Sequence, residues 1–239
     1  MRELCLAFGA RRVFGRLSCV LPGGRLSVLM GTSGSGKSTL LRVIAGLQRA
    51  DTGEVRIDGV DVTQLDGTGL AALRRRIGML FQSAALLDSM SIFDNVALPL
   101  REHTDHTAGE IGDEVHRRLQ QVGLDDVDDL LPSELSGGML RRAALARAIV
   151  MDPELLLCDE PFSGLDPPNV RRIEALLLRI NRELGLTVVV TSHHTASALR
   201  MADHLVLLSG ERAIQGSPAE LLAGSDRTVR DFFADEAPT

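Results

Sequence analysis

Continuous apolar runs alternate with segments of helical spacing along most of the chain. The runs Leu26–Met30, Leu155–Cys158 and Leu186–Thr191 contain few polar positions, which is typical of strands buried on both faces of a parallel sheet. Helical spacing or composition follows or precedes these runs at 40–44, 140–149 and 168–184. This alternation predicts an α/β fold with a mainly parallel sheet and right-handed crossovers.

Shorter alternating segments precede and interrupt this pattern. Residues 3–8 and 16–21 have the spacing of strands, and the turn Pro22-Gly23-Gly24 leads into the run at 26–30. Further short strands are predicted at 53–59, 77–81 and 205–208, and a helix at 70–76. Glycines bound several of these segments, as expected where strands end in turns.

The stretch 83–100 is apolar and broken into short pieces. One interpretation is a buried helical lobe, and the sharper one is a docking surface, because a patch rich in Leu, Met and Phe suits a partner helix. The next stretch, 101–113, is polar. His103 and His106 within it suggest either a metal site or, as we expect, a solvated loop. A helix is predicted at 113–122, and the acidic run 125–129 predicts a turn.

Composition narrows the class of protein. The chain has 239 residues, which suits one large α/β domain or a domain plus a small lobe, and 44% of them are apolar, enough for a real core. The formal net charge of −6 argues against nucleic-acid binding. Cys5, Cys19 and Cys158 have no metal or redox spacing and predict buried thiols. No apolar run approaches the roughly 18 residues that span a bilayer, and the charged start predicts no secretory signal.

A glycine-rich loop, GTSGSGKST, follows the apolar run at 26–30 and precedes a helical segment. This strand–loop–helix context is what a phosphate-binding loop requires. Its glycines allow a close backbone approach, and loop N–H groups with the helix N-terminus attract an anion. Lys37 is the only lysine of the chain, which favours this interpretation over an incidental turn. The predicted nucleotide-binding residues are Gly31, Thr32, Ser33, Gly34, Ser35, Gly36, Lys37, Ser38 and Thr39.

Two carboxylates follow the buried run at 155–158. Asp159 and Glu160 would lie at the edge of the sheet where open α/β folds bind ligands. Together with the glycine loop they predict Asp159 as the carboxylate on the Mg²⁺ side, with the Ser38 hydroxyl as another ligand, and Glu160 as the general base for water.

A second anion site is predicted at a helix start. Ser136 occupies an N-cap position, and Gly137 and Gly138 leave the helix N-terminus bare. Taken alone, a simple helix cap explains this pattern better.

The base of a nucleotide has no obvious partner, because the chain lacks Tyr and Trp. Phe8 is the nearest aromatic residue, although we interpret it as core or edge-strand packing. Arg11 or Arg12 would then cover the base.

These motifs form a known set in a known order. GTSGSGKST resembles a Walker A loop, Gln82 a Q-loop, LSGGM an ABC signature, LLLCDE a Walker B strand, SGLD a D-loop and His193 a switch histidine. The chain resembles the nucleotide-binding subunits of ABC transporters over nearly its whole length. The resemblance implies a P-loop NTPase fold in a single domain, 1–239, with a RecA-like core of mainly parallel strands, an N-terminal antiparallel β part and a helical subdomain at about 84–150.

A closer resemblance lies between the motifs. The stretches MLFQSAALLDSMSIFDNVALPLREHT, PSELSGGMLRRAALARAIVMDPELLLCDEPFSGLDP and TVRDFFAD resemble ATPases of the Mla (Mce-type) phospholipid transport system of Gram-negative bacteria. Met139, where most ABC proteins have glutamine, and the paired arginines after it are part of this likeness. His194 departs from it by replacing an aspartate, and the tail stops at Thr239.

The resemblance also assigns roles. It implies ATP and Mg²⁺ as cofactors, with metal ligands Ser38, Gln82 and Asp159. Catalytic roles fall on Glu160, Lys37, Gln82 and His193, with His194 the alternative to His193. ATP would bind between two head-to-tail copies, with Ser136, Gly137 and Gly138 of one copy facing the phosphate loop of the other.

The implied partners place the chain at a membrane. They are a second copy, an integral-membrane permease (MlaE-like) docking on about 83–100, an Mce-domain subunit (MlaD-like) and, as an accessory, a STAS-type subunit (MlaB-like). The chain would lie peripherally on the cytoplasmic face of the inner membrane. The expected function is ATP hydrolysis that powers phospholipid transport between the inner and outer membranes.

Three alternatives stay open. One is an ABC ATPase for another substrate, such as an amino acid or a metal complex. A non-transport ABC protein acting on DNA or ribosomes is disfavoured, because no long coiled-coil insertion, second cassette or basic face is seen. A binding module without hydrolysis is disfavoured because Lys37, Asp159, Glu160 and His193 are all present.

Overall fold

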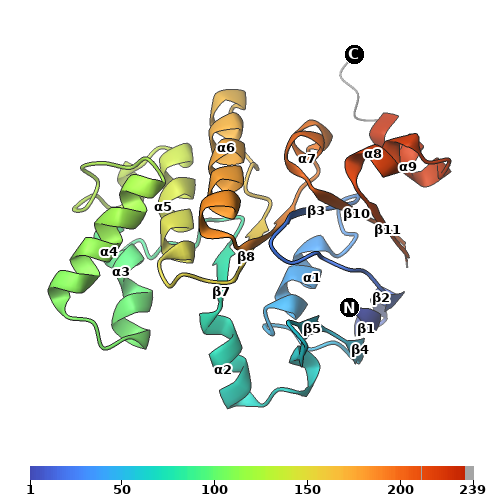
Figure 1. Cartoon of the computed structure of the whole chain (residues 1–239), viewed down its shortest axis with the longest axis horizontal. Helices are drawn as coiled ribbons and strands as arrows, with labels where there is room; N and C mark the ends of the chain where they lie inside the picture. Colours follow the sequence, from blue (N-terminus) through green and yellow to red (C-terminus); the bar gives the residue numbers. More distant parts are fainter. Residues whose placement is uncertain (211, 235–239) are drawn as a thin grey trace. The chain divides into compact units, whose positions relative to one another are not determined.

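The computed structural model describes residues 1–210 and 212–234. They form two compact units: unit 1 consists of Met1–Arg74 and the chain from Thr187 onward, and unit 2 of Arg75–Leu186. Figure 1 labels the elements of both units. No helix in the described part of the chain is long and apolar enough to cross a membrane.

The parallel strands of unit 1 centre on β3 (Leu26–Met30), whose five residues are all buried. It pairs in parallel with β9 (Thr187–Thr191) on one side and β10 (His204–Ser209) on the other. The strand β11 (Arg212–Gly216) adds to β10 in the antiparallel direction. The predicted strands at 26–30, 186–191 and 205–208 are therefore confirmed.

The remaining strands of unit 1 are antiparallel. β1 (Arg2–Phe8) lies between β2 (Arg11–Leu17) and β4 (Thr52–Glu54). β5 (Arg56–Ile57) and β6 (Val60–Asp61) form a short hairpin. The predicted strand at 16–21 is wrong in its bounds, because Gly9 takes a φ of 58° and turns the chain at once, so that Phe8 pairs with Arg11.

The α-helices in the described part of unit 1 are α1 (Lys37–Ile44), α2 (Gly67–Arg75, whose last residue begins unit 2), α7 (Thr195–Met201), α8 (Pro218–Ala223) and α9 (Arg227–Ala234). Cysteine burial in this unit is only partly as predicted. Cys19 is buried, whereas Cys5 on β1 is half-exposed.

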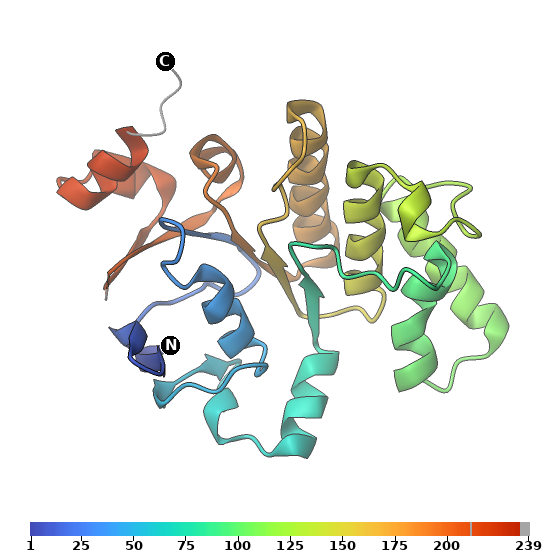
Figure 2. The ribbon, with the colours of Figure 1, turned by 180° about the vertical axis from the view of Figure 1, so that it is seen from behind.

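Unit 2 contains two parallel strands and a group of helices. β7 (Ile77–Leu80) pairs with β8 (Leu155–Asp159), and Leu80 lies opposite Cys158. The helices α3 (Ile92–His103), α4 (Ala108–Gln121) and α5 (Gly137–Ile149) pack on one another, as the view in Figure 2 also shows.

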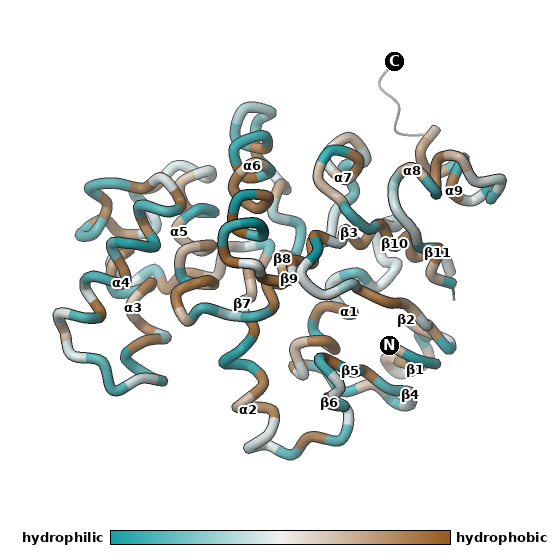
Figure 3. The backbone as a smooth tube through the Cα atoms, in the orientation of Figure 1, coloured by the Kyte–Doolittle hydropathy of each residue, from teal (hydrophilic) through white to brown (hydrophobic). Residues whose placement is uncertain are grey.

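The helix α6 (Pro167–Leu184) completes unit 2. Its buried residues include Val170, Ile173, Leu177 and Ile180 at the three- and four-residue spacing of an amphipathic helix. Hydrophobic (brown) and hydrophilic (teal) segments accordingly recur from turn to turn along α6 in Figure 3.

The predicted loop at 101–113 is mostly helical. α3 continues to His103 and α4 begins at Ala108. Thr107 and Glu110 form a capping box: the Thr107 hydroxyl accepts from the Glu110 N–H at 3.3 Å, and the Glu110 carboxylate accepts from the Thr107 N–H at 2.7 Å. This local cap overrides the polar composition of the segment.

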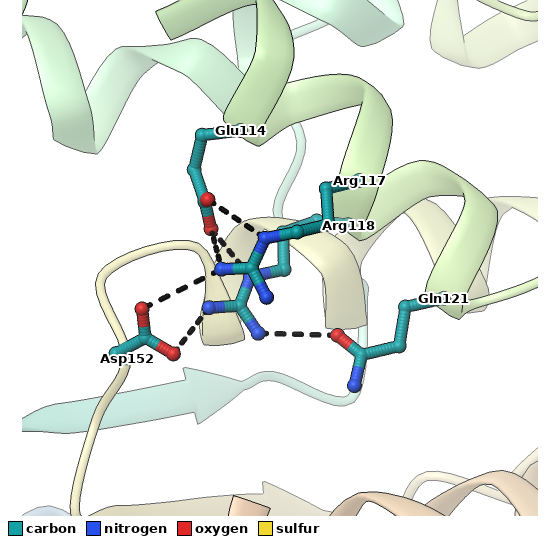
Figure 4. A network of polar contacts seen from close by, with 5 residues as sticks. All are labelled: Glu114, Arg117, Arg118, Gln121 and Asp152. Atoms are coloured by element: carbon teal, nitrogen blue, oxygen red, sulfur yellow. Dashed lines mark hydrogen bonds and ion pairs between the residues drawn. The ribbon is translucent and has the colours of Figure 1, made fainter. Parts of the chain in front are cut away.

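A buried arginine ties α4 to the chain after α5. The Arg118 side chain is fully buried, and Figure 4 shows it between Glu114 and Asp152. Its Nε donates to Glu114 at 2.7 Å, its Nη1 to Gln121 at 3.1 Å, and its Nη2 to Asp152. A buried charge with this many partners holds the helices of unit 2 in one arrangement.

Candidate functional site

The phosphate loop of unit 1 connects β3 to α1 as predicted. Gly31, Gly34 and Gly36 have φ angles of 149°, 80° and 96°, a region that favours glycine. A Cβ at Gly31 would lie 2.6 Å from the Ser35 hydroxyl, and one at Gly36 would lie 2.6 Å from the Phe14 ring. The loop therefore packs against β2, and it cannot take side chains at these positions without moving.

Lys37 lies inside this loop. Its side chain is nearly buried, and Nζ donates to the Gly31 carbonyl at 2.8 Å and to the Thr32 carbonyl at 3.4 Å. No side chain caps the N-terminus of α1. The ammonium group and the N-terminus of α1 thus bring positive charge to the same loop.

The two histidines lie in the same unit. β9 runs parallel to β3, with Thr191 opposite Leu29, so His193 and the phosphate loop emerge at the same edge of the sheet. His193 is exposed, and its ring centroid lies 4.5 Å from that of His194. His194 is the N-cap residue of α7, and its backbone N–H donates to the Ser192 hydroxyl at 2.9 Å.

Phe8 is at the end of β1, with 51% of its surface exposed. Of the two parts of the interpretation of Phe8, core packing is therefore wrong, whereas packing at the end of the strand is not contradicted; its neighbour Ala7 is exposed as well. Arg11 reaches the phosphate loop instead, with Nη2 3.5 Å from the Gly34 carbonyl.

Unit 2 brings together Gln82 and the two carboxylates. β7 and β8 are parallel and Leu80 lies opposite Cys158, so Gln82 and Asp159–Glu160 leave the strands at the same edge. The Gln82 amide nitrogen lies 3.5 Å from the Ser163 hydroxyl. Burial raises the pKa of the adjoining Cys158 thiol, which shows how apolar the strand behind the carboxylates is.

Asp159 and Glu160 are both nearly buried, at 4% and 9% exposure. Glu160 has a φ of 47°, and a left-handed backbone at a residue other than glycine is strained. Such strain is found where the surrounding structure fixes a side chain for function, and it agrees with the role predicted for Glu160.

The signature residues begin α5, also in unit 2. Ser136 is the N-cap, as predicted, and its hydroxyl accepts from the Met139 N–H at 3.4 Å. Ser136 and Gly137 are exposed, while Gly138 is buried against α6, where a Cβ would lie 2.7 Å from the Asn169 side chain.

Arg141 was not singled out from the sequence, although it lies among these residues. Its Nη1 donates to the carbonyls of Phe81, at 3.0 Å, and of Gln82, and its Nη2 donates to the Ser163 carbonyl at 3.3 Å. Burial lowers the pKa of Arg141. The signal in the sequence is a pair of arginines in a helix rich in Ala and Leu.

The apolar stretch 83–100 satisfies parts of both interpretations. Ile92, Val96 and Leu100 of α3 are buried, as a helical lobe requires. Leu87 is 44% exposed and Phe93 is partly exposed, which leaves apolar surface before and at the start of the helix.

His103 and His106 are exposed, and the described residues contain no group of three or more His, Cys, Asp or Glu side chains that could hold a metal ion.

Comparison with known proteins shows a clear relationship. A family model described as ABC transporter matches residues 14–163. The intermembrane phospholipid transport system ATP-binding protein MlaF of Escherichia coli K12 is 44% identical over 98% of this chain and 87% of its own. The same protein of Haemophilus influenzae is 42% identical over 99% of this chain and 90% of its own.

A relative with a different printed function also matches. The probable ribonucleotide transport ATP-binding protein Mkl of Mycobacterium leprae is 40% identical over 98% of this chain but only 67% of its own.

Solved structures share the fold. MJ0796, a bacterial ABC transporter cassette solved as a dimer, has a TM-score of 0.83 at 29% identity, covering 90% of this chain and 97% of its own. The structure of cbiO1 from Clostridium perfringens, part of the transporter complex cbiONQ, has a TM-score of 0.85 at 27% identity, covering 99% and 97%.

Proposed function

Because the chain belongs to the ABC transporter family, we propose that it is the ATP-hydrolysing subunit of a transporter that moves phospholipids between the inner and outer membranes. The observation that carries this proposal is the 44% identity to a phospholipid transport ATP-binding protein over 98% of the chain. The identification as an ABC ATPase agrees with the sequence motifs.

The probable ribonucleotide transport ATP-binding protein Mkl supports a second candidate, since it is 40% identical. The phospholipid candidate is favoured because the chain covers 87% of MlaF but 67% of Mkl. When two proteins are similar over most of both their lengths, little additional sequence remains that could give one of them a different function.

The phosphate loop of unit 1 has features that suit the phosphates of a nucleoside triphosphate. The left-handed glycines expose loop N–H groups, α1 has no side-chain cap, and Lys37 lies within the loop. We assign phosphate binding to Gly31–Thr39. Phe8 or Arg11 would cover the base, since both lie at the exposed end of the β1–β2 hairpin beside this loop.

The Mg²⁺ ligands are proposed from the chemistry of the single residues. Ser38, Gln82 and Asp159 offer hydroxyl, amide and carboxylate oxygens, which are the hard donors that Mg²⁺ prefers. Bound Mg²⁺ would neutralise charge on the phosphate oxygens. In this proposal Glu160 accepts the proton of the attacking water, and His193 donates a hydrogen bond to the γ-phosphate.

Two copies would complete the site. Ser136 and Gly137 are exposed at the N-terminus of α5, so the signature of one copy is available to the phosphate loop of the other. This arrangement uses two anion-binding helix starts with a single Lys37 in each chain.

The apolar surface around Leu87 and Phe93 is proposed to receive a MlaE-like permease. An Mce-domain (MlaD-like) subunit and a STAS-type (MlaB-like) subunit would complete the assembly on the cytoplasmic face of the inner membrane.

Lipid transfer between vesicles tests the proposal. The chain is purified with the permease encoded in the same genome and reconstituted into donor vesicles with a fluorescent phospholipid. ATP-dependent transfer to acceptor vesicles is expected for the wild type and none for Glu160→Gln. ATP-dependent accumulation of a labelled ribonucleotide, without lipid transfer, would reject the phospholipid assignment in favour of the second candidate.

A further inference from the structure

The chain between β7 and α3 depends on side chains from elsewhere for its shape. Residues 81–91 form no helix or strand, and Ala84 and Ala85 have left-handed φ angles of 63° and 55°. We call this stretch the Q segment, because it contains Gln82. A segment without regular backbone pairing keeps one conformation only if its polar groups are bound by other parts of the fold.

Three side chains within unit 2 bind the backbone of the Q segment. Asn95, which is fully buried, accepts from the Leu87 N–H at 2.7 Å and donates to carbonyls of Leu87, Met90 and Ser91. Arg147 donates to the Ala85 carbonyl at 2.8 Å and to the Ala84 carbonyl at 3.2 Å. Arg141 donates to Phe81 and Gln82.

Arg141 differs from the other two because it also binds a second segment. Its Nη2 donates to the Ser163 carbonyl at 3.3 Å, and Ser163 is linked to Glu160 by a backbone hydrogen bond of 3.1 Å. The Gln82 side chain in turn lies 3.5 Å from the Ser163 hydroxyl. One guanidinium therefore binds two backbone segments: the start of the Q segment, which carries Gln82, and the end of the Glu160–Ser163 turn.

The place of Arg141 on α5 adds a third connection. Arg141 lies five residues after the N-cap Ser136, in the first turns of the signature helix. The planar guanidinium presents several donors in a fixed geometry, so the start of α5, the Q segment and the Glu160–Ser163 turn share one rigid junction.

We propose that Arg141 is a positioning residue that sets Gln82 relative to the Glu160–Ser163 turn by holding the carbonyls of Phe81, Gln82 and Ser163. The proposal rests on the proposed function in so far as Gln82 serves Mg²⁺ and ATP. A lysine cannot replace this arginine fully, because a single ammonium does not reproduce the spacing of two guanidinium nitrogens.

Arg142 supplies a matched control on the same helix. It is adjacent to Arg141, and burial likewise lowers its pKa. Its Nη1 donates to the Val122 carbonyl at 3.2 Å and to the Gly123 carbonyl, at the end of α4. Arg142→Gln thus removes a charge and two carbonyl bonds from α5 without touching the Q segment.

Hydrogen exchange measured by mass spectrometry tests the structural half of the proposal on the full chain without nucleotide. The Ala84 N–H donates to the Phe81 carbonyl at 2.9 Å, and that carbonyl is one that Arg141 holds. Arg141→Gln should speed exchange in peptides covering 81–91 and 160–166, and Arg142→Gln should speed it near 122–123 only. Equal protection of 81–91 in wild type and Arg141→Gln would overturn the proposal.

The Mg²⁺ dependence of ATP binding tests the functional half. A fluorescent ATP analogue is titrated at several Mg²⁺ concentrations. Loss of a residue that orients a metal ligand typically costs about 10- to 100-fold in metal affinity, so Arg141→Gln should raise the half-saturating Mg²⁺ concentration by about that factor. Arg141→Lys should recover part of it, and Arg142→Gln should leave it unchanged.

A double-variant cycle separates positioning from general destabilisation. If Arg141 acts through Gln82, the pair Arg141→Gln/Gln82→Ala should be no worse in Mg²⁺ dependence than Gln82→Ala alone. Additive losses in the pair, or equal losses in Arg141→Gln and Arg142→Gln, would reject the positioning role. Failure of the wild type to bind Mg²⁺–ATP would instead reject the proposed function and leave the exchange result to decide on the junction itself.

Discussion

Glu160 combines a strained backbone with a nearly buried carboxylate. A left-handed φ at such a residue costs about 1–3 kcal/mol. This cost arises at the position of the proposed general base, whose side chain must be held in place. General-base assistance is worth about 10²–10⁴-fold. Glu160→Gln should therefore lose ATPase activity by about that factor while ATP still binds and two copies stay associated.

Turnover assays and size-exclusion chromatography with ATP check this expectation. Glu154→Gln is the control. Glu154 directly precedes the same strand, and its exposed carboxylate forms an ion pair with Arg76. Near-normal turnover in Glu160→Gln would remove Glu160 from the mechanism.

The two adjacent histidines differ in exposure and in their position relative to α7. His193 is exposed and comes first after β9, whereas His194 starts α7 and binds Ser192 through its N–H. In the assembled transporter, His193→Ala should lose ATPase activity and His194→Ala should keep it. The reverse result would shift the assignment by one residue.

Cysteine reactivity reports on burial at the residue scale. Burial raises the pKa of the Cys19 thiol to about 11, so it stays protonated at pH 8, and only a thiolate reacts with an alkylating reagent. Iodoacetamide at pH 8 should modify the half-exposed Cys5 first and leave Cys19 and Cys158 intact until the chain unfolds. Mass spectrometry of the peptides measures this, and equal early labelling of Cys19 would contradict its burial.

Residues whose role depends on neighbours in the sequence were predictable, and those that act across long separations were not. Lys37 and its glycines lie in one loop, so spacing alone reveals their chemistry. Arg141 binds carbonyls about 60 positions away along the chain, and Asn95 binds main-chain groups in an irregular segment. Hydrogen bonds from a side chain to a distant backbone group produce no periodic pattern in the sequence, so they could not be predicted from it.

At the scale of elements, buried strands were the most predictable parts. β3 and β8 are mostly apolar and all five residues of each are buried, as expected for strands covered on both faces. The errors lie where one residue decides a boundary. Because the chain turns at Gly9, the second strand lies at 11–17 and not at 16–21. Because Thr107 caps a helix, the predicted polar loop contains the start of α4.

The capping box of α4 can be tested directly. Thr107→Ala removes an N-cap hydroxyl and should lower the free energy of unfolding by about 1 kcal/mol, whereas Thr107→Ser should keep most of it. Urea denaturation of the three proteins measures the difference. A Thr107→Ala variant as stable as the wild type would mean that α4 starts without help from its cap.

The same cap predicts a pH dependence. The backbone N–H of Thr107 is the main cause that lowers the pKa of Glu110. A carboxyl whose pKa is lower in the folded state stabilises the fold above its ordinary pKa, and this contribution is lost as the pH falls through the lowered value. The free energy of unfolding that the wild type gains over Glu110→Ala, measured by urea denaturation, should therefore shrink in acid.

At the scale of the whole molecule, the exposed apolar surface at Leu87 and Phe93 predicts a partner that covers it. An apolar anchor buried by a partner contributes about 1.5–3 kcal/mol, so Leu87→Glu or Phe93→Glu should release the subunit from the membrane. ATP binding by the free subunit should survive, since the phosphate loop belongs to the other unit. Leu47→Glu, at an exposed leucine outside this surface, is the control.

Co-purification with the permease decides this prediction. Folded Leu87→Glu and Phe93→Glu variants that stay bound at full stoichiometry would place the docking surface elsewhere on the chain.

The single lysine has a practical consequence for anyone labelling this protein. Lys37 holds the only side-chain amine, and its Nζ is bound inside the phosphate loop. The other amine is that of Met1, which donates to the Cys19 carbonyl. Amine-directed cross-linkers and dyes therefore cannot map the outer surface of this subunit. Acylation of Lys37 becomes instead a one-site footprint, and its slowing by a ligand reports that the phosphate loop is filled.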